Sequence, residues 1–153
     1  MALRLARPAD AGAVADVLQA SRATAMPWLA VVHDDADVRG WVAGVLLATC
    51  EVLVVDEGGQ VLAVSARAGD VLEQLYVAPQ AQGRGLGRAL LQQAQAGRDR
   101  LELWTFARNA RARRFYATAG FVEVEHTDGS GNEEREPDVR LVWERPAAGR
   151  VAG

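Results

Sequence analysis

The residues best suited to chemistry lie in a glycine-rich stretch, Gln82-Gly83-Arg84-Gly85-Leu86-Gly87-Arg88. Apolar residues recur after it at positions 86, 89, 90 and 94, which is the spacing of one face of a helix. The first turn of a helix has backbone N–H groups without intrahelical partners, and glycine leaves them open to a ligand. Because the helix dipole also favours an anion there, the stretch predicts a phosphate or pyrophosphate site.

Two common phosphate-binding motifs do not fit this stretch. A nucleoside-triphosphate P-loop needs Gly-Lys-Ser/Thr, and the sequence contains no lysine. The dinucleotide fingerprint G-x-G-x-x-G belongs to the first strand–helix unit, whereas here the spacing is Gly83-x-Gly85-x-Gly87 and several strands precede it. A serine hydrolase is also disfavoured, because no G-x-S-x-G elbow occurs in the chain.

The pattern Gln82-x-x-Gly85-x-Gly87, after a strand ending in Val-x-Pro, resembles the acetyl-CoA motif of the GNAT superfamily of N-acetyltransferases. A second stretch is independently similar to the same family: Asn109-x-x-Ala112-x-x-Phe115-Tyr116-x-x-x-Gly120-Phe121. The two stretches follow each other in the family's order and at a typical separation. Two independent motifs make the resemblance far more specific than either one alone.

The resemblance implies acetyl-CoA (coenzyme A) as co-substrate and no metal. The strand before the loop is expected to splay from its parallel neighbour, 101–106, and to bind the pantetheine arm through main-chain groups of Leu75, Tyr76 and Val77. The loop amides hold the pyrophosphate; the residues implied are Gln82, Gly83, Arg84, Gly85, Leu86, Gly87 and Arg88. The two arginines add charge-assisted contacts or are solvated surface residues. Asn109 caps its helix and contacts the CoA arm, and Phe115 lies in the core or beside the cofactor.

Tyr116 and Glu73 are the catalytic residues that the resemblance and the strand pattern suggest. In many family members the tyrosine matching Tyr116 protonates the departing thiolate, and a phenol near pKa ~10 is a plausible donor to a thiol near ~8.5. Its alternative is a core aromatic. Glu73 shares strand parity with Leu75 and Val77, so it is expected to face the substrate as general base, or to be an inactive edge carboxylate. Weaker candidates for the base are Glu125, His126, His33, Glu133 and Glu134.

Acceptor specificity is expected from two variable segments, 22–33 and 127–138. Met26 and Trp28 are expected to wall the acceptor pocket. Glu133 and Glu134, with other acidic residues of the two segments, would attract a cationic amine, unless they form a solvated surface. The acceptor is a small-molecule or peptide amine that the sequence does not identify.

The elements that position these residues follow from periodicity and turn residues. Strands are predicted at 3–6, 51–56, 61–66, 71–77, 101–106, 121–125 and 139–143. Helices are predicted after Asp10, after Asp34 or Asp35, at 85–97 and after Asn109, and Gly120 ends the last. The order is β-α-α-β-β-β-α-β-α-β-β. This is an α/β fold, a GNAT-like mixed sheet of about six to seven strands flanked by four helices.

Composition describes an ordinary globular chain. Its 153 residues predict one domain, which the resemblance makes an acetyltransferase domain over 1–145, followed by a flexible tail over 146–153. The net charge of -3 gives no support to a nucleic-acid partner. A single cysteine, Cys50, excludes an intramolecular disulfide and is expected to be a buried small hydrophobe. Lack of a signal peptide or an apolar run of membrane-spanning length favours a cytoplasmic protein without a membrane partner. A homodimer is left open.

These observations predict an N-acetyltransferase that moves an acetyl group from acetyl-CoA to a primary amine by direct attack in a ternary complex. The alternative is a CoA-binding regulatory module that lacks turnover. The size of the acyl group, the base and the acceptor are left undetermined.

Overall fold

The computed structural model describes residues 1–147, and the order of its elements is the predicted one. The strands are β1 (Ala2–Leu5), β2 (Glu51–Glu57), β3 (Gln60–Ala68), β4 (Val71–Val77), β5 (Arg100–Phe106), β6 (Val122–His126) and β7 (Asp138–Glu144). The helices are α1 (Ala11–Ala25), α2 (Asp35–Trp41), α3 (Leu47–Thr49), α4 (Leu86–Gln95) and α5 (Ala110–Thr118), with short 3-10 turns at Pro8–Asp10 and Pro79–Ala81. Of the tail predicted from residue 146, the part 148–153 lies outside the described residues.

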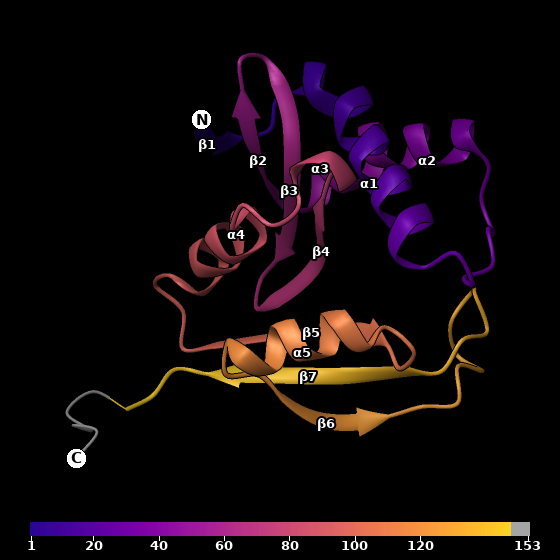
Figure 1. Cartoon of the computed structure of the whole chain (residues 1–153), viewed down its shortest axis with the longest axis vertical. Helices are drawn as coiled ribbons and strands as arrows, with labels where there is room; N and C mark the ends of the chain where they lie inside the picture. The colour runs from indigo at the N-terminus through magenta and orange to yellow at the C-terminus, as the bar shows by residue number, and fades with distance from the viewer. Residues whose placement is uncertain (148–153) are drawn as a thin grey trace.

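One seven-stranded sheet runs in the order β1-β2-β3-β4-β5-β7-β6. All neighbours are antiparallel except β4 and β5, which are parallel and pair only at Val71 and Glu102. Beyond that point the two strands diverge: in Figure 1, β4 runs along the upper half of the molecule while β5 crosses the lower half. The splay expected from the family resemblance is therefore present.

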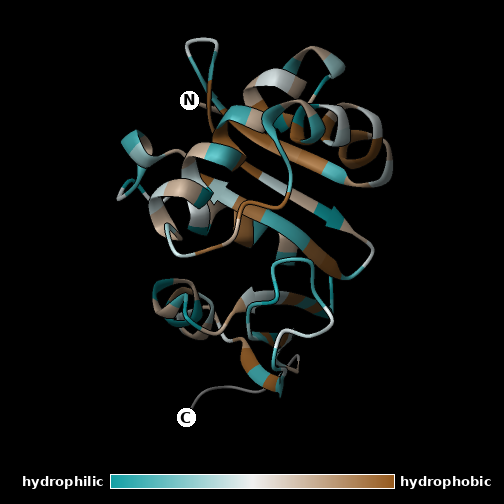
Figure 2. Cartoon of the chain, turned by 90° about the vertical axis from the view of Figure 1, so that its right-hand side faces the viewer, coloured by the Kyte–Doolittle hydropathy of each residue, from teal (hydrophilic) through white to brown (hydrophobic). Residues whose placement is uncertain are grey.

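Helices cover both faces of the sheet around β3 and β4. α1 and α4 both pack on these strands, and every residue from Val61 to Ala66 in β3 is buried, which requires cover on both faces. α4 lies on the face of Val77, because a Cβ on Gly87 would stand 3.5 Å from Val77 Cγ2. Figure 2 shows hydrophobic stretches along the strands between the helices.

Two hydrophobic cores lie on either side of the splay. The first contains α1, β2, β3 and the start of α4, and the second contains β5, β7 and α5. Leu75, on β4, packs against both cores. The halves of the molecule are thus packed separately and joined through β4 and α4.

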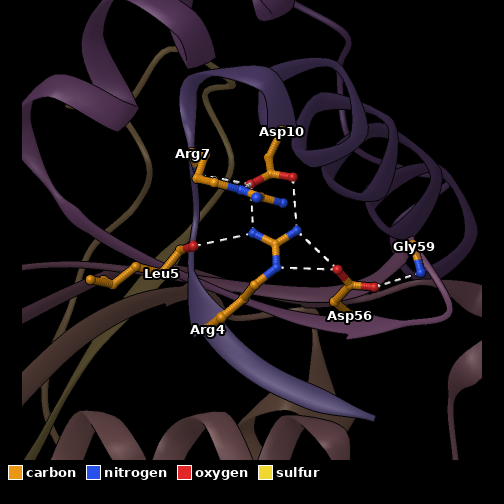
Figure 3. A network of polar contacts seen from close by, with 6 residues as sticks. All are labelled: Arg4, Leu5, Arg7, Asp10, Asp56 and Gly59. Carbon is orange, nitrogen blue, oxygen red and sulfur yellow. Dashed lines mark hydrogen bonds and ion pairs between the residues drawn. The ribbon is translucent and has the colours of Figure 1, made fainter.

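Arg4 connects β1 with the 3-10 turn before α1 and with the end of β2 (Figure 3). Its guanidinium donates to Asp10 at 2.7 and 3.0 Å and to Asp56 at 3.0 and 3.1 Å. Asp10 also accepts from the N–H of Arg7 at 2.7 Å, so its side chain makes no cap bond to α1. The helix begins after Asp10, as predicted, but the carboxylate at this N-cap position serves an ion-pair network and does not bond to the helix N–H groups.

The helix predicted after Asp34 or Asp35 is present but interrupted. Asp34 caps it, with Oδ1 accepting from the Asp37 N–H at 2.8 Å, but a π turn at Val42–Leu46 separates α2 from α3. The wider turn breaks the 3.6-residue period. As a result Val42 and Leu46 are buried, while Trp41 and Val45 are exposed. Cys50, just beyond, is half-buried against the first core.

Candidate active site

The glycine stretch opens α4 as a cluster of free backbone donors. Gly83 and Gly85 have φ of 81° and 79°, a left-handed conformation that glycine adopts without strain. Within residues 1–147, no acceptor bonds the backbone N–H groups of positions 83–88. Unpaired amides at the start of a ten-residue helix form a cradle for an anion.

Three arginines lie near this cradle and differ in the contacts that they make. Arg84 pairs with Glu57 of the β2–β3 hairpin, so its charge is already partly compensated. Arg88 lines the adjoining cavity. Arg111, which the sequence reasoning missed, lines the same cavity from α5 and donates from Nη1 to Gln82 Oε1 at 3.3 Å. Its position two residues after the helix cap was the only signal for it.

A cavity of about 350 Å³ leads from the cradle along β4. On one side β4 pairs with β3 through Leu75, Tyr76 and Val77, and on the other side the splay leaves these residues without a strand partner. The Val77 carbonyl accepts from Ser21 Oγ of α1 at 2.7 Å, a contact that no sequence pattern indicated. Predicted residues that line the cavity are Leu75, Tyr76, Val77, Gln82, Gly83, Gly85, Leu86, Gly87, Arg88, Asn109, Phe115, Tyr116 and Met26.

A second cavity, of about 100 Å³, adjoins the first between the splayed strands. Glu73 and Gln74 of β4 and Trp104, Thr105 and Phe106 of β5 contribute to its wall. Among residues 1–147, six line both cavities, so the two spaces share a wall. The arrangement allows two molecules to approach one point from different sides.

Tyr116 lies where the cavities meet, positioned by the helix that Asn109 caps. Asn109 Oδ1 accepts from the Ala112 N–H at 3.1 Å, which confirms the predicted cap. The Tyr116 ring packs edge-on against Phe115 at 5.1 Å and Phe121 at 5.5 Å and is 8 % exposed. Burial, and then the neighbouring phenol of Tyr76, raise the pKa of Tyr116.

Glu73 lines the smaller cavity, as Leu75 does. The pairing of β3 with β4 shifts between Ala66 and Arg67, which leaves Glu73 as the extra residue of a β-bulge. Strand parity with Leu75 and Val77 therefore does not by itself fix the direction of the Glu73 side chain, and its role as base stays a prediction. The side chain is exposed at the cavity wall.

The weaker base candidates line neither cavity. Glu125 pairs with Arg140 at 2.9 Å and His126 with Glu123 at 3.3 Å, both on the β6 side of the sheet. His33 contacts Glu133 at 2.7 Å, and this carboxylate raises the pKa of His33. These side chains pair with other side chains of the protein and lie outside both cavities.

The two segments expected to form the acceptor site contact each other. Met26 is buried and lines both cavities, whereas Trp28 packs edge-on to Phe106 at 6.2 Å and stacks on the Arg108 guanidinium at 4.5 Å. Glu134 pairs with Arg22 at 3.4 Å, and Glu136 with Arg108 at 2.7 Å. The acidic loop is thus largely neutralised by arginine and histidine instead of presenting free carboxylates.

Among residues 1–147, no group of three or more His, Cys, Asp or Glu side chains is arranged to hold a metal ion. No helix in this part of the chain is long and apolar enough to cross a membrane.

Comparison with known proteins matches residues 30–123 to the family model of the acetyltransferase (GNAT) domain. A mycothiol acetyltransferase from Beutenbergia cavernae is 42% identical over 102 residues, covering 63% of this chain and 28% of that protein. The peptidyl-lysine N-acetyltransferase YiaC of Escherichia coli is 38% identical over 80 residues, covering 52% of this chain and 55% of that protein. The chain therefore spans only part of the length of these relatives.

Solved structures share the fold over nearly the whole chain. The apo form of YjaB from Escherichia coli has a TM-score of 0.78 at 20% identity and covers 93% of this chain and 96% of its own. The structure of yncA from Salmonella typhimurium with acetyl-CoA has a TM-score of 0.69 at 22% identity, covering 100% and 99%.

Proposed function

Because the chain belongs to the GNAT acetyltransferase family, we propose that it transfers the acetyl group of acetyl-CoA directly to a primary amine while both substrates are bound. The observation that carries this proposal is the continuous path from the α4 cradle along β4 to Tyr116. A cofactor with a pyrophosphate at one end and a thioester at the other matches a path with anion donors at one end and a buried phenol at the other. The family membership predicted from the two motifs is confirmed.

Each part of the path has a proposed role. The amides of 82–88, with Arg88 and Arg111, hold the pyrophosphate end. The main-chain groups of Leu75 and Tyr76 on the splayed side of β4 hold the pantetheine arm, which passes Asn109 and Phe115. The thioester then lies where the two cavities meet, and the amine arrives through the smaller one.

The chemistry needs a neutral amine and a protonated leaving group. An ammonium acceptor first loses a proton to a base, and Glu73 is the carboxylate that lines the acceptor cavity. Nitrogen attack forms the C–N bond, the C–S bond breaks, and the sulfur takes a proton from Tyr116. The extra proton that the nitrogen then loses restores the Tyr116 phenol. Burial of Tyr116 keeps water away from the reacting carbonyl.

The acceptor is proposed only as a small-molecule or peptide amine. Relatives of this chain are named for mycothiol and for peptidyl-lysine acceptors, which differ in size and charge. Glu133, Glu134 and Glu136 are each paired with an arginine or a histidine. Recognition of a cationic amine by unpaired negative charge alone is therefore disfavoured.

A thiol-release assay tests the proposal. Acetyl-CoA is supplied with single amino acids, spermidine, small aromatic amines and lysine-containing peptides, and free CoA is measured. Release that depends on one amine, with the acetylated amine detected by mass spectrometry, supports the proposal and identifies the acceptor class. Tight acetyl-CoA binding without release on any amine would instead support a CoA-binding module that lacks turnover.

A further inference from the structure

In the part of the chain that the structure describes, six residues line both cavities: Met26, Leu75, Tyr76, Asn109, Ala112 and Tyr116. Asn109 is engaged in capping α5. Tyr76 and Tyr116 are the two tyrosines of the chain and the two residues of this set whose side chains carry a transferable proton. Both tyrosines therefore lie at the place where the proposed reaction occurs.

The two phenols reach this junction from different elements. Leu75 and Val77 bracket Tyr76 on β4, and Val77 faces α4, so alternation directs Tyr76 toward the face that α1 covers. On that face the charged groups near the phenol are Arg22 of α1 and Glu134 of the β6–β7 loop. Tyr116 comes from α5, on the other side of the junction.

Neither hydroxyl is committed to a bond with the protein. Within residues 1–147 no hydrogen bond involves either phenol oxygen, and no side-chain polar atom there is enclosed without a partner. Because both residues line both cavities, each hydroxyl is available to a bound molecule. Burial raises the pKa of both side chains, so a phenolate formed at either one needs a nearby donor.

We propose that the Tyr76 hydroxyl is a second catalytic group, which passes a proton from the acceptor nitrogen to Tyr116 during acetyl transfer; this inference rests on the proposed function. After attack, the nitrogen carries one proton more than the amide product. Tyr116 gives its proton to the departing sulfur, and the nitrogen gives its proton to Tyr76. Tyr76 gives its own proton to Tyr116 through a bridging water, because the two hydroxyls are not hydrogen-bonded to each other. The C–N bond forms, the C–S bond breaks, and both tyrosines end as neutral phenols.

A double-mutant cycle tests this relay. Tyr76→Phe and Tyr116→Phe each remove one oxygen atom and keep the ring, and the rates are measured with acetyl-CoA and the amine of the panel that gives the fastest thiol release. Each single variant should lower kcat about 10²–10³-fold, within the range of a general acid–base group. The double variant should be no slower than about the slower single variant, because both residues act on one proton path. KM for acetyl-CoA should change less than about twofold in this series.

Three results would overturn the relay. The first is a Tyr76→Phe variant with the wild-type kcat. The second is a Tyr76→Phe variant with a raised KM for the amine and an unchanged kcat, which would show that Tyr76 only lines the pocket. Rate losses that multiply in the double variant would show two independent roles. A melting-temperature shift with acetyl-CoA, measured on all four proteins, shows that each variant folds and binds.

Failure of the relay and failure of the proposed function give different patterns. A wild type that releases thiol while Tyr76→Phe is unaffected rejects only the relay, whereas a wild type without release on any amine rejects both.

A readout besides activity is available because the chain has only two tyrosines. With 3-fluorotyrosine at both positions, CoA should move both ¹⁹F resonances, and a shift confined to Tyr116 would contradict the placement of Tyr76.

Discussion

Removal of one oxygen atom separates the catalytic role of Tyr116 from its packing. Tyr116→Phe keeps the edge-on contacts with Phe115 and Phe121, and the lost hydroxyl has no hydrogen-bond partner within residues 1–147. We expect kcat to fall about 10²–10³-fold, since a general acid contributes on that order. The thermal midpoint and the KM for acetyl-CoA should change little. Steady-state kinetics beside a melting curve measure both, and an unchanged kcat would remove the acid role.

Asp10 makes the stability of the fold sensitive to acid. Hydrogen bonds from Arg4 and then from the Arg7 N–H lower the pKa of Asp10 to about 2. The folded-state pKa thus lies below the unfolded value of ~3.9, so the unfolded chain binds the proton more readily. Stability is present above about pH 4 and is lost as pH falls toward 2; the linkage amounts to about 2 kcal/mol.

Urea unfolding at pH 7 and at pH 3 measures this loss. Asp10→Asn should be less stable than wild type at pH 7, because it leaves Arg4 with Asp56 as its remaining carboxylate partner. Its own stability should then fall less between the two pH values. An equal fall in wild type and variant would assign the acid sensitivity to other carboxylates.

At the scale of elements, Gly87 in the first turn of α4 gives the clearest test of the anion cradle. A single Cβ there would meet Val77 and Phe115 at 3.5 and 3.6 Å, which are ordinary contacts, so Gly87→Ala should fold with equal or greater stability. The branched side chain of Gly87→Val extends further into the cavity. We expect it to weaken acetyl-CoA binding at least about 10-fold, or 1.4 kcal/mol, by calorimetry.

Gly87→Ala is the matched control for this comparison, since it should bind acetyl-CoA nearly as wild type does. Gly85 is less suitable, because its φ of 79° would strain any side chain and lower stability as well. If Gly87→Val lost binding and stability in parallel, the residue would have a packing role rather than a place in the cofactor path.

Local sequence patterns predicted most elements, because each carries its own signals. Asn109 caps α5 through a bond within three residues, and the Gly58-Gly59 hairpin turn adopts the positive φ angles that its glycines favour. The same reasoning could not predict the π turn at Val42–Leu46 or the bulge at Glu73, because both depend on the packing of neighbouring elements. Arg111 and Ser21 were missed for a related reason: their contacts join segments distant in sequence.

At the scale of the whole molecule, the splay divides the protein into two packed halves. One core lies with β2 and β3 and the other with β5 and β7, and the only residue pair between β4 and β5 is Val71 with Glu102. The larger cavity lies along this division and takes its wall from α1, β4, α4 and α5. A molecule that fills it contacts elements from both halves, so binding and global stability should be coupled.

Acetyl-CoA should therefore raise the melting temperature and protect the splayed strands. At a free concentration 100 times its Kd, a ligand specific for the folded state adds about 2.7 kcal/mol. For a domain of this size that corresponds to a shift of about 5–10 °C in a thermal scan. Hydrogen exchange should slow in β4, in the start of α4 and in α5, which line the cavity, more than in β1 and β6 at the sheet edges. Gly87→Val should show a much smaller shift at the same concentration. A wild-type protein that does not shift at saturating acetyl-CoA would contradict the assignment of this cavity to the cofactor.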